Sequence, residues 1–139
     1  MKAVMILCDH AAVAESKLYI SGGGWNSTLG GAEAVPSGLA LLIDVPWDMT
    51  NTDLDIRVTL LTEDGQGVMV DGPAGPQPIV MGGVAQVGRP VGHPLGTPVT
   101  LPMAMNVGPL PLPAGVRFTW ELTINGEHRE DWRVSFGTR

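Results

Sequence analysis

The chain has 139 residues, a formal net charge of −6 and a pI near 4.8. This charge repels phosphate backbones and anionic lipid surfaces, so the composition argues against nucleic-acid and membrane partners. The hydrophobic content of 44% predicts a packed fold, and the length suits one domain over residues 1–139.

The apolar run at the start of the chain is short. It extends from Ala3 to Cys8 and stops at Asp9, whereas a signal-peptide core needs about 7–15 apolar residues and a membrane-spanning helix about 20. We therefore expect no signal peptide and a location in the cytoplasm or in a virion. Cys8 is the only cysteine, so an internal disulfide is excluded.

Two stretches in the middle of the chain alternate with the period of a β-strand, Leu39 to Val45 and Leu54 to Leu60. Residues 46–52 between them are long enough to cross from one sheet to another, and Glu63-Asp64-Gly65 predicts a turn. These patterns are typical of an antiparallel β-sandwich, an all-β fold that we expect to have about eight to nine strands.

The N-terminal part predicts two more strands. Val4 to Cys8 is apolar on both faces, which is typical of a central strand, and Leu18 and Ile20 begin another strand. Residues 10–16 hold either a loop or one helical turn, which would be the only helix. Gly22-Gly23-Gly24 lacks the Lys and Ser/Thr of a phosphate loop, so it predicts a bulge or a bend where the chain changes strands.

Residues 72–115 are rich in glycine and proline but contain two predicted strands, 79–87 and 99–107. Because proline cannot donate to a β-ladder, both strands are expected to lie at sheet edges or to be bounded by their prolines. Gly82-Gly83 predicts a bulge in the first of them.

The C-terminal hairpin contains two aromatic faces that are both expected to be buried. A two-residue turn at Asn125-Gly126 alone would put them on opposite faces of the sheet. A three-residue loop with Gly126 in the left-handed conformation would place Phe118 opposite Trp132 and keep both faces together. A one-residue bulge near Glu130-Asp131 would have the same effect.

Several short motifs, taken together, are similar to those of one protein family. They are Lys17-Leu18-Tyr19 with Gly22-Gly23-Gly24-Trp25, Val45-Pro46-Trp47 with Thr50-Asn51, Glu63-Asp64-Gly65, the run from Leu110 to Gly115, and Ile124-Asn125-Gly126-Glu127. The chain resembles a family of small uncharacterised proteins of high-GC Gram-positive bacteria and their phages. The resemblance implies a β-sandwich and carries no assigned activity.

No set of residues predicts catalysis or a cofactor. Cys8 and His10 share a strand face, but a cysteine in an apolar run is usually a buried, inert thiol. The three histidines lack metal-ligand spacing. The acidic loop from Asp44 to Asp55 is predicted to be a solvated rim, although such loops also bind calcium in some sandwiches. We therefore expect neither an enzyme nor a bound metal.

Two functional classes remain. The first is a structural or interaction module that contacts protein subunits, such as a homo-oligomer, a capsid-decoration protein, or another minor capsid or tail protein of a phage. The high mean hydropathy of +0.17 predicts an apolar contact surface in the proline-rich region. Its candidate residues are Met81, Met103, Met105, Leu110 and Leu112. The alternative is a module that binds a small ligand or a carbohydrate with Trp25 and with Trp47, Asp48 and Asn51 of the acidic loop.

Overall fold

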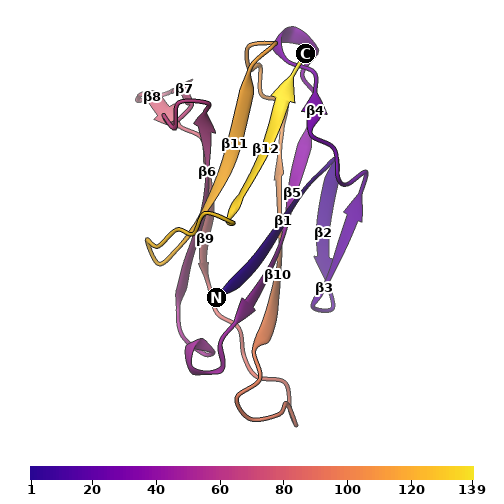
Figure 1. Cartoon of the computed structure of the whole chain (residues 1–139), viewed down its shortest axis with the longest axis vertical. Helices are drawn as coiled ribbons and strands as arrows, with labels where there is room; N and C mark the ends of the chain where they lie inside the picture. Colours follow the sequence, from indigo (N-terminus) through magenta and orange to yellow (C-terminus); the bar gives the residue numbers. More distant parts are fainter.

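Alternating apolar residues form strands that pack as two facing β-sheets in the computed structural model, which describes all 139 residues (Figure 1). One sheet has three strands in the order β1 (Lys2–Cys8), β5 (Ser37–Val45) and β10 (Val99–Val107). The other has five in the order β4 (Ser27–Thr28), β12 (Arg133–Thr138), β11 (Arg117–Ile124), β6 (Leu54–Thr62) and β9 (Val80–Ala85).

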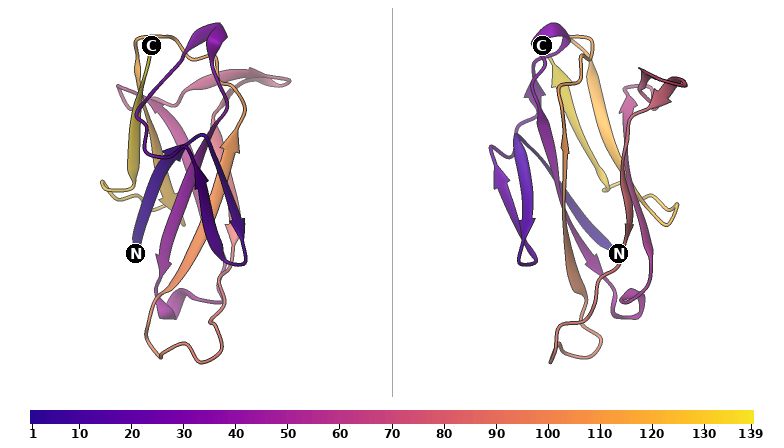
Figure 2. Two further views of the ribbon diagram at one scale, coloured as in Figure 1. Left: turned by 90° about the vertical axis from the view of Figure 1, so that its right-hand side faces the viewer. Right: turned by 180° about the vertical axis from the view of Figure 1, so that it is seen from behind.

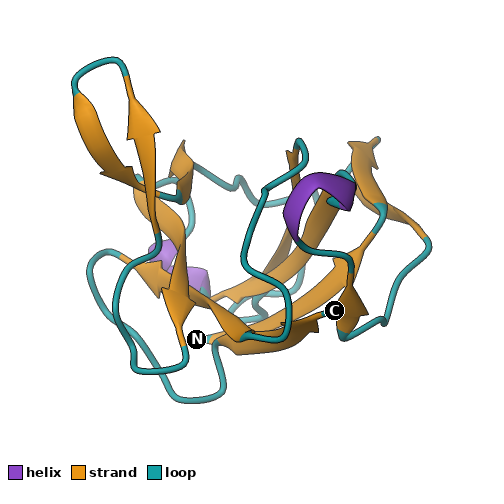
Figure 3. Ribbon diagram, turned by 90° about the horizontal axis from the view of Figure 1, so that it is seen from above, coloured by secondary structure: helices purple, strands orange, loops and turns teal.

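Two hairpins complete a total of twelve strands, β2 (His10–Ala14) with β3 (Lys17–Ser21), and β7 (Met69–Gly72) with β8 (Gly75–Pro78). The only helical segments are two three-residue 3-10 turns, η1 (Gly31–Glu33) and η2 (Trp47–Met49), drawn purple in Figure 3. The predicted all-β fold is confirmed. However, no helical turn forms at residues 10–16, because these residues make a strand and the tight turn of the first hairpin.

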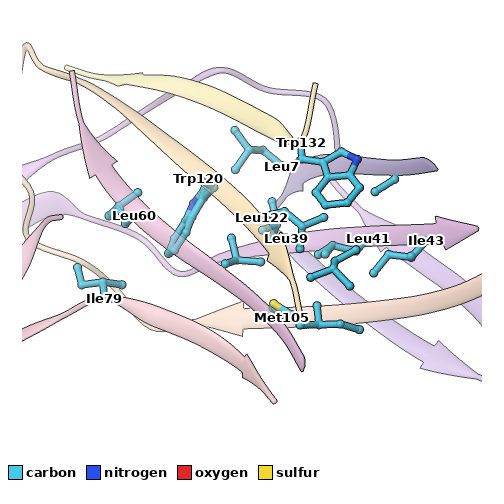
Figure 4. Close-up of a cluster of buried hydrophobic side chains, with 14 of the residues drawn as sticks. Leu7, Leu39, Leu41, Ile43, Leu60, Ile79, Met105, Trp120, Leu122 and Trp132 are labelled. Atoms are coloured by element: carbon cyan, nitrogen blue, oxygen red, sulfur yellow. The ribbon is translucent and has the colours of Figure 1, made fainter. Parts of the chain in front are cut away.

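The core lies between the two sheets and contains a cluster of 19 buried residues. Leu39, Leu41 and Ile43 of β5 point into it from the three-stranded sheet, and Trp120 and Leu122 of β11 point into it from the five-stranded sheet (Figure 4). Residues 46–52 connect β5 of one sheet to β6 of the other, as the sequence predicts. This shared core is what holds the two sheets face to face.

β1 is an edge strand, so its predicted central position is wrong. Only the end of its second apolar face, at Ile6 and Cys8, is covered from outside, because the β2–β3 hairpin folds back over part of the outer face of the three-stranded sheet (Figure 2). Apolar residues on both faces of a strand therefore reflect a third layer here and not a second neighbouring strand. After β3 the chain bends at Gly22 to Gly24 and enters β4 of the other sheet, as expected of a strand switch.

β9 and β10 both lie at sheet edges, which confirms the prediction from their prolines and glycines. The predicted bulge at Gly82-Gly83 is absent, since the pairing of β6 with β9 keeps one register from Leu54 to Thr59. Gly82 instead has a φ of +138° and lies so close to the carbonyl of Ile56 that a Cβ atom would clash with it.

The β11–β12 hairpin closes through a two-residue turn. Ile124 and Glu127 exchange both backbone hydrogen bonds, at 2.9 and 3.0 Å, and Asn125 and Gly126 have positive φ. The register then shifts over residues 128–131, so that Phe118 pairs with Phe136. The predicted pairing of Phe118 with Trp132 is therefore wrong.

The reason for that prediction nevertheless holds. Phe118 and Trp132 are each 3% exposed and lie in the same core cluster, so the two aromatic sets share one face of the sheet. For this, even-numbered residues of β11 must pair with even-numbered residues of β12. The extra residues at 128–131 produce that pairing, and the turn does not.

The β7–β8 hairpin projects from the body of the molecule, as seen from above in Figure 3. Its strands pair only with each other. Met69, in this hairpin, is 54% exposed.

Candidate functional site

The outer face of the three-stranded sheet carries an uncovered apolar row. Val4, Leu42 and Pro102 lie directly opposite one another on β1, β5 and β10. Their neighbours in the chain, such as Leu41, face the core, so these even-numbered residues face outward. Val4 is 43% and Leu42 37% exposed. We call these three residues the outer apolar row.

The β2–β3 hairpin covers the other half of the same face. Cys8, Ala11 and Ala40 form a small buried cluster beneath it. The side-chain amide of Asn106 fixes this contact, because its Oδ1 accepts from the backbone N–H of Ala11 at 3.0 Å and its Nδ2 donates to the Ala11 carbonyl at 2.8 Å. Gly38 makes room for it, since a Cβ there would lie 2.7 Å from Asn106 Oδ1.

The hairpin adds apolar surface beside the outer apolar row. Its pairing sets Ala11 opposite Ile20 and Val13 opposite Leu18, so these four residues share the face that Ala11 buries against the sheet. Ala11 is buried and Leu18 is half-buried, whereas Val13 is 43% and Ile20 38% exposed. The outer apolar row and this part of the hairpin together form the candidate functional site.

The edge of β10 beside this site is interrupted as a template for a further strand. The carbonyl of Leu7 in β1 accepts a hydrogen bond from the N–H of Gly24, which does not belong to β5. The backbone N–H and C=O groups of the odd-numbered residues of β1 therefore point away from β5. By the same alternation, the even-numbered residues of β10, including Pro102, face its open edge. Pro102 offers no N–H there. A partner at this site is thus expected to pack on the face of the sheet.

The five residues predicted for an apolar contact surface lie elsewhere. Met105 and Leu112 are buried at 7% exposure, and Met81, Met103 and Leu110 are half-buried against the core. Much of the apolar content of the proline-rich region therefore fills the sandwich. Val4 and Leu42 were not identified as surface residues from the sequence. A signal was present, because both are apolar residues at positions that alternate with the core-facing residues of their strands.

The residues predicted to form a ligand loop are not brought together. Trp25 packs edge-on against Phe136, with ring centroids 6.1 Å apart, and lies near the Ser37 end of β5. Trp47 follows Val45 at the other end of that strand. A strand of this length separates its ends by roughly 26 Å.

Trp47 is engaged within its own loop region. The Arg89 guanidinium lies 3.8 Å from the centre of the indole ring, and His93 stacks on Trp47 at 6.3 Å. Arg89 also donates to the Trp47 carbonyl at 2.8 Å. Asp48 and Asn51 are exposed, and the Asn51 N–H donates to the carbonyl of Val87 at 2.8 Å. These contacts attach the chain around residues 87–93 to η2 and occupy the ring that a sugar would need.

Cys8 is fully buried, whereas His10 is exposed. Burial raises the pKa of the Cys8 thiol, and the neighbouring charge of Asp9 adds to the effect, while a backbone hydrogen bond from His10 opposes it. A raised pKa disfavours the thiolate, which is the nucleophilic form.

The carboxylates of the acidic loop are dispersed. Asp44 accepts a hydrogen bond from Thr100, Asp53 accepts one from Gln86, and Asp55 pairs with Arg57 at 3.0 Å. Nowhere in the structure do three or more His, Cys, Asp or Glu side chains gather in a way that could hold a metal ion. None of the helical segments is long and apolar enough to span a membrane.

The model of a family of unknown function, DUF6941, matches residues 3–136. The chain belongs to the DUF6941 family. The match begins in β1 and ends in β12, so it includes both sheets and both hairpins of the fold described above. The expected membership of an uncharacterised family is thereby confirmed. No curated protein and no solved structure matched the chain.

Proposed function

We propose that this DUF6941 protein is a non-enzymatic interaction module that binds a protein subunit through the outer apolar row. The observation that carries the proposal is that Val4 and Leu42, at 43% and 37% exposure, lie side by side on a sheet face that the β2–β3 hairpin covers only in part. A contiguous apolar surface of this kind is typical of protein–protein contacts.

The chemistry of the surface favours a protein partner over other macromolecules. The net charge of −6 disfavours nucleic acid and anionic membranes, and only 16% of the residues are charged. The partner is a second copy of the chain or another subunit of an assembly. The resemblance to proteins of high-GC Gram-positive bacteria and their phages supports a virion as that assembly, with the protein in a capsid-decoration, minor capsid or tail position.

Sedimentation velocity over a range of protein concentrations, alone and with candidate virion subunits, tests the proposal. The wild-type protein should form a larger species under at least one of these conditions. Leu42→Glu should abolish it, because a carboxylate in the contact would lose its hydration.

Val84→Glu is the matched control, since Val84 is 67% exposed on β9 of the other sheet. It should associate like the wild type. A wild-type protein that stays monomeric and binds none of the subunits would overturn the proposal, and so would equal association of the Leu42→Glu variant.

A further inference from the structure

A second feature lies at the end of the sandwich where β5 leads into η2. A cavity of about 260 Å³ opens there, beside the turn of the β11–β12 hairpin. Met1, Pro46, Met49 and Trp132 supply its apolar wall, and Glu127 and Arg129 contribute charged groups. None of these residues belongs to the outer apolar row, so this cavity is separate from the proposed protein contact.

The apolar wall contains one buried polar atom without a partner. Trp132 is 3% exposed, and its indole Nε1 is buried without a hydrogen bond. Figure 4 shows this nitrogen on the side of the ring toward Ile43, the end of β5 that precedes Pro46 and Met49. Because this nitrogen is enclosed by the core, the indole ring and not its N–H forms part of the cavity wall.

The two charged side chains of the cavity are also unpaired. Neither Glu127 nor Arg129 forms a salt bridge or a side-chain hydrogen bond. The Arg129 guanidinium lies 5.4 Å from the centre of the Trp132 ring, which places a cation beside the apolar wall. The backbone fixes this arrangement, because the Trp132 N–H donates to the Arg129 carbonyl at 2.9 Å. Donors for an anionic group and a carboxylate for a cationic group thus border one apolar cavity.

We infer that this cavity binds a free amino acid with an apolar side chain. Its carboxylate would accept hydrogen bonds from Arg129, and its ammonium group would pair with Glu127. Its side chain would contact Met1, Pro46 and Met49, since methionine adapts to apolar groups of varied shape. An apolar cavity of 150 Å³ holds benzene, so 260 Å³ suits about ten non-hydrogen atoms, the size of leucine or phenylalanine. The side chains of Arg129 and Glu127 supply one charge of each sign, which matches the two charged groups of a zwitterion.

Titration with L-leucine, monitored by the indole N–H resonances in ¹H–¹⁵N correlation spectra, tests this inference. One indole resonance, assigned to Trp132 by its loss in Trp132→Phe, should shift in a saturable manner. N-acetyl-L-leucine lacks the ammonium group and L-leucinamide lacks the carboxylate, so each should bind at least about fivefold more weakly, as for loss of a charged hydrogen bond.

Variants of the charged residues keep the test independent of any folding defect in Trp132→Phe, because Glu127 and Arg129 are exposed. Glu127→Gln and Arg129→Gln should each weaken L-leucine binding by a similar factor, while Glu130→Gln, outside the cavity, should not. The absence of a saturable shift with both L-leucine and L-phenylalanine would overturn the inference. Unchanged binding in both charged variants would do so as well.

Discussion

Thr138, near the end of β12, is one of two buried polar residues. Its hydroxyl lies 2.6 Å from the carbonyl of Pro113 and 3.1 Å from the backbone nitrogen of Val116, so it donates to one and accepts from the other. The side chain therefore adds to the backbone hydrogen bonds, Gly115 N–H to Thr138 and Thr138 N–H to Val116, that hold the segment before β11 against the last strand. Both backbone groups would lose this partner if the hydroxyl were removed.

Thr138→Val should lower the free energy of unfolding by about 1–3 kcal/mol, because the substitution keeps the shape and leaves buried polar groups unpaired. Urea denaturation measures this change. Thr123→Val is the control, since Thr123 is half-buried in β11 without a side-chain hydrogen bond, and should change stability by less than about 0.5 kcal/mol. Equal effects of the two substitutions would contradict the role given to the Thr138 hydroxyl.

Cys8 predicts a pH dependence. Because the pKa of its thiol is raised in the folded protein, the folded state retains a proton that the unfolded state releases. Its contribution to stability is fully present below the unfolded thiol pKa of about 8.5 and is lost as the pH rises through the folded value. Between pH 8 and 10, wild-type stability should therefore decrease more steeply than that of Cys8→Ala, as measured by urea denaturation at each pH. Parallel profiles would show that the thiol does not titrate differently in the two states.

At the scale of secondary-structure elements, the β2–β3 hairpin depends on one side chain. Asn106 satisfies both backbone groups of Ala11, which no strand pairs on that side. The remaining contacts of the hairpin with the sheet are small, the buried cluster being Cys8, Ala11 and Ala40.

Asn106→Ala should release the hairpin while the sandwich remains folded. Hydrogen exchange of the Ala11 amide and its neighbours in β2 should accelerate at least about tenfold, the effect of losing about 1.4 kcal/mol of local stability. Amides of β5 and β11 should exchange as in the wild type. Asn26→Ala is the control, because Asn26 is exposed and its side chain makes no hydrogen bond. Unchanged exchange in β2 would show that packing alone holds the hairpin.

The sequence predicts elements better than their contacts, for a physical reason. Period-two alternation is local, so β5, β6 and β11 were evident from it. The exact register of β11–β12 was not, because the sequence did not distinguish a bulge at the turn from extra residues near Glu130-Asp131, where the shift lies. The position of β1 was wrong because apolar residues on both faces do not distinguish a neighbouring strand from a covering hairpin.

The candidate site was harder to predict than the fold. The outer apolar row joins residues from three strands that are up to 98 positions apart, from Val4 to Pro102, and depends on how far the hairpin extends over the sheet. Methionine and leucine content in the proline-rich region did not reveal whether Met105 faces the core or solvent. Similarly, Trp47 could be recognised as a loop residue, but its contact with Arg89 depends on a separate loop.

For the whole molecule, the closed core of 19 residues and the scattered acidic side chains predict a fold that does not depend on metal. Addition of EDTA should change the melting temperature by less than about 1 °C, since no bound ion would be removed. Differential scanning calorimetry with and without EDTA measures this. A decrease of many degrees, restored by calcium, would instead assign a structural ion to the acidic loop.

The projecting β7–β8 hairpin has a consequence for how this architecture can vary. It is inserted between Val68 and Ile79, whose backbone groups bond to each other at 3.1 Å, so its two ends already lie side by side. A shorter turn, a longer arm or a foreign peptide joined at these two residues would leave the sandwich ladder unchanged. Such a position allows one scaffold to acquire different appendages, and it is where a recombinant tag or a reporter loop can be inserted without disturbing the rest of the chain.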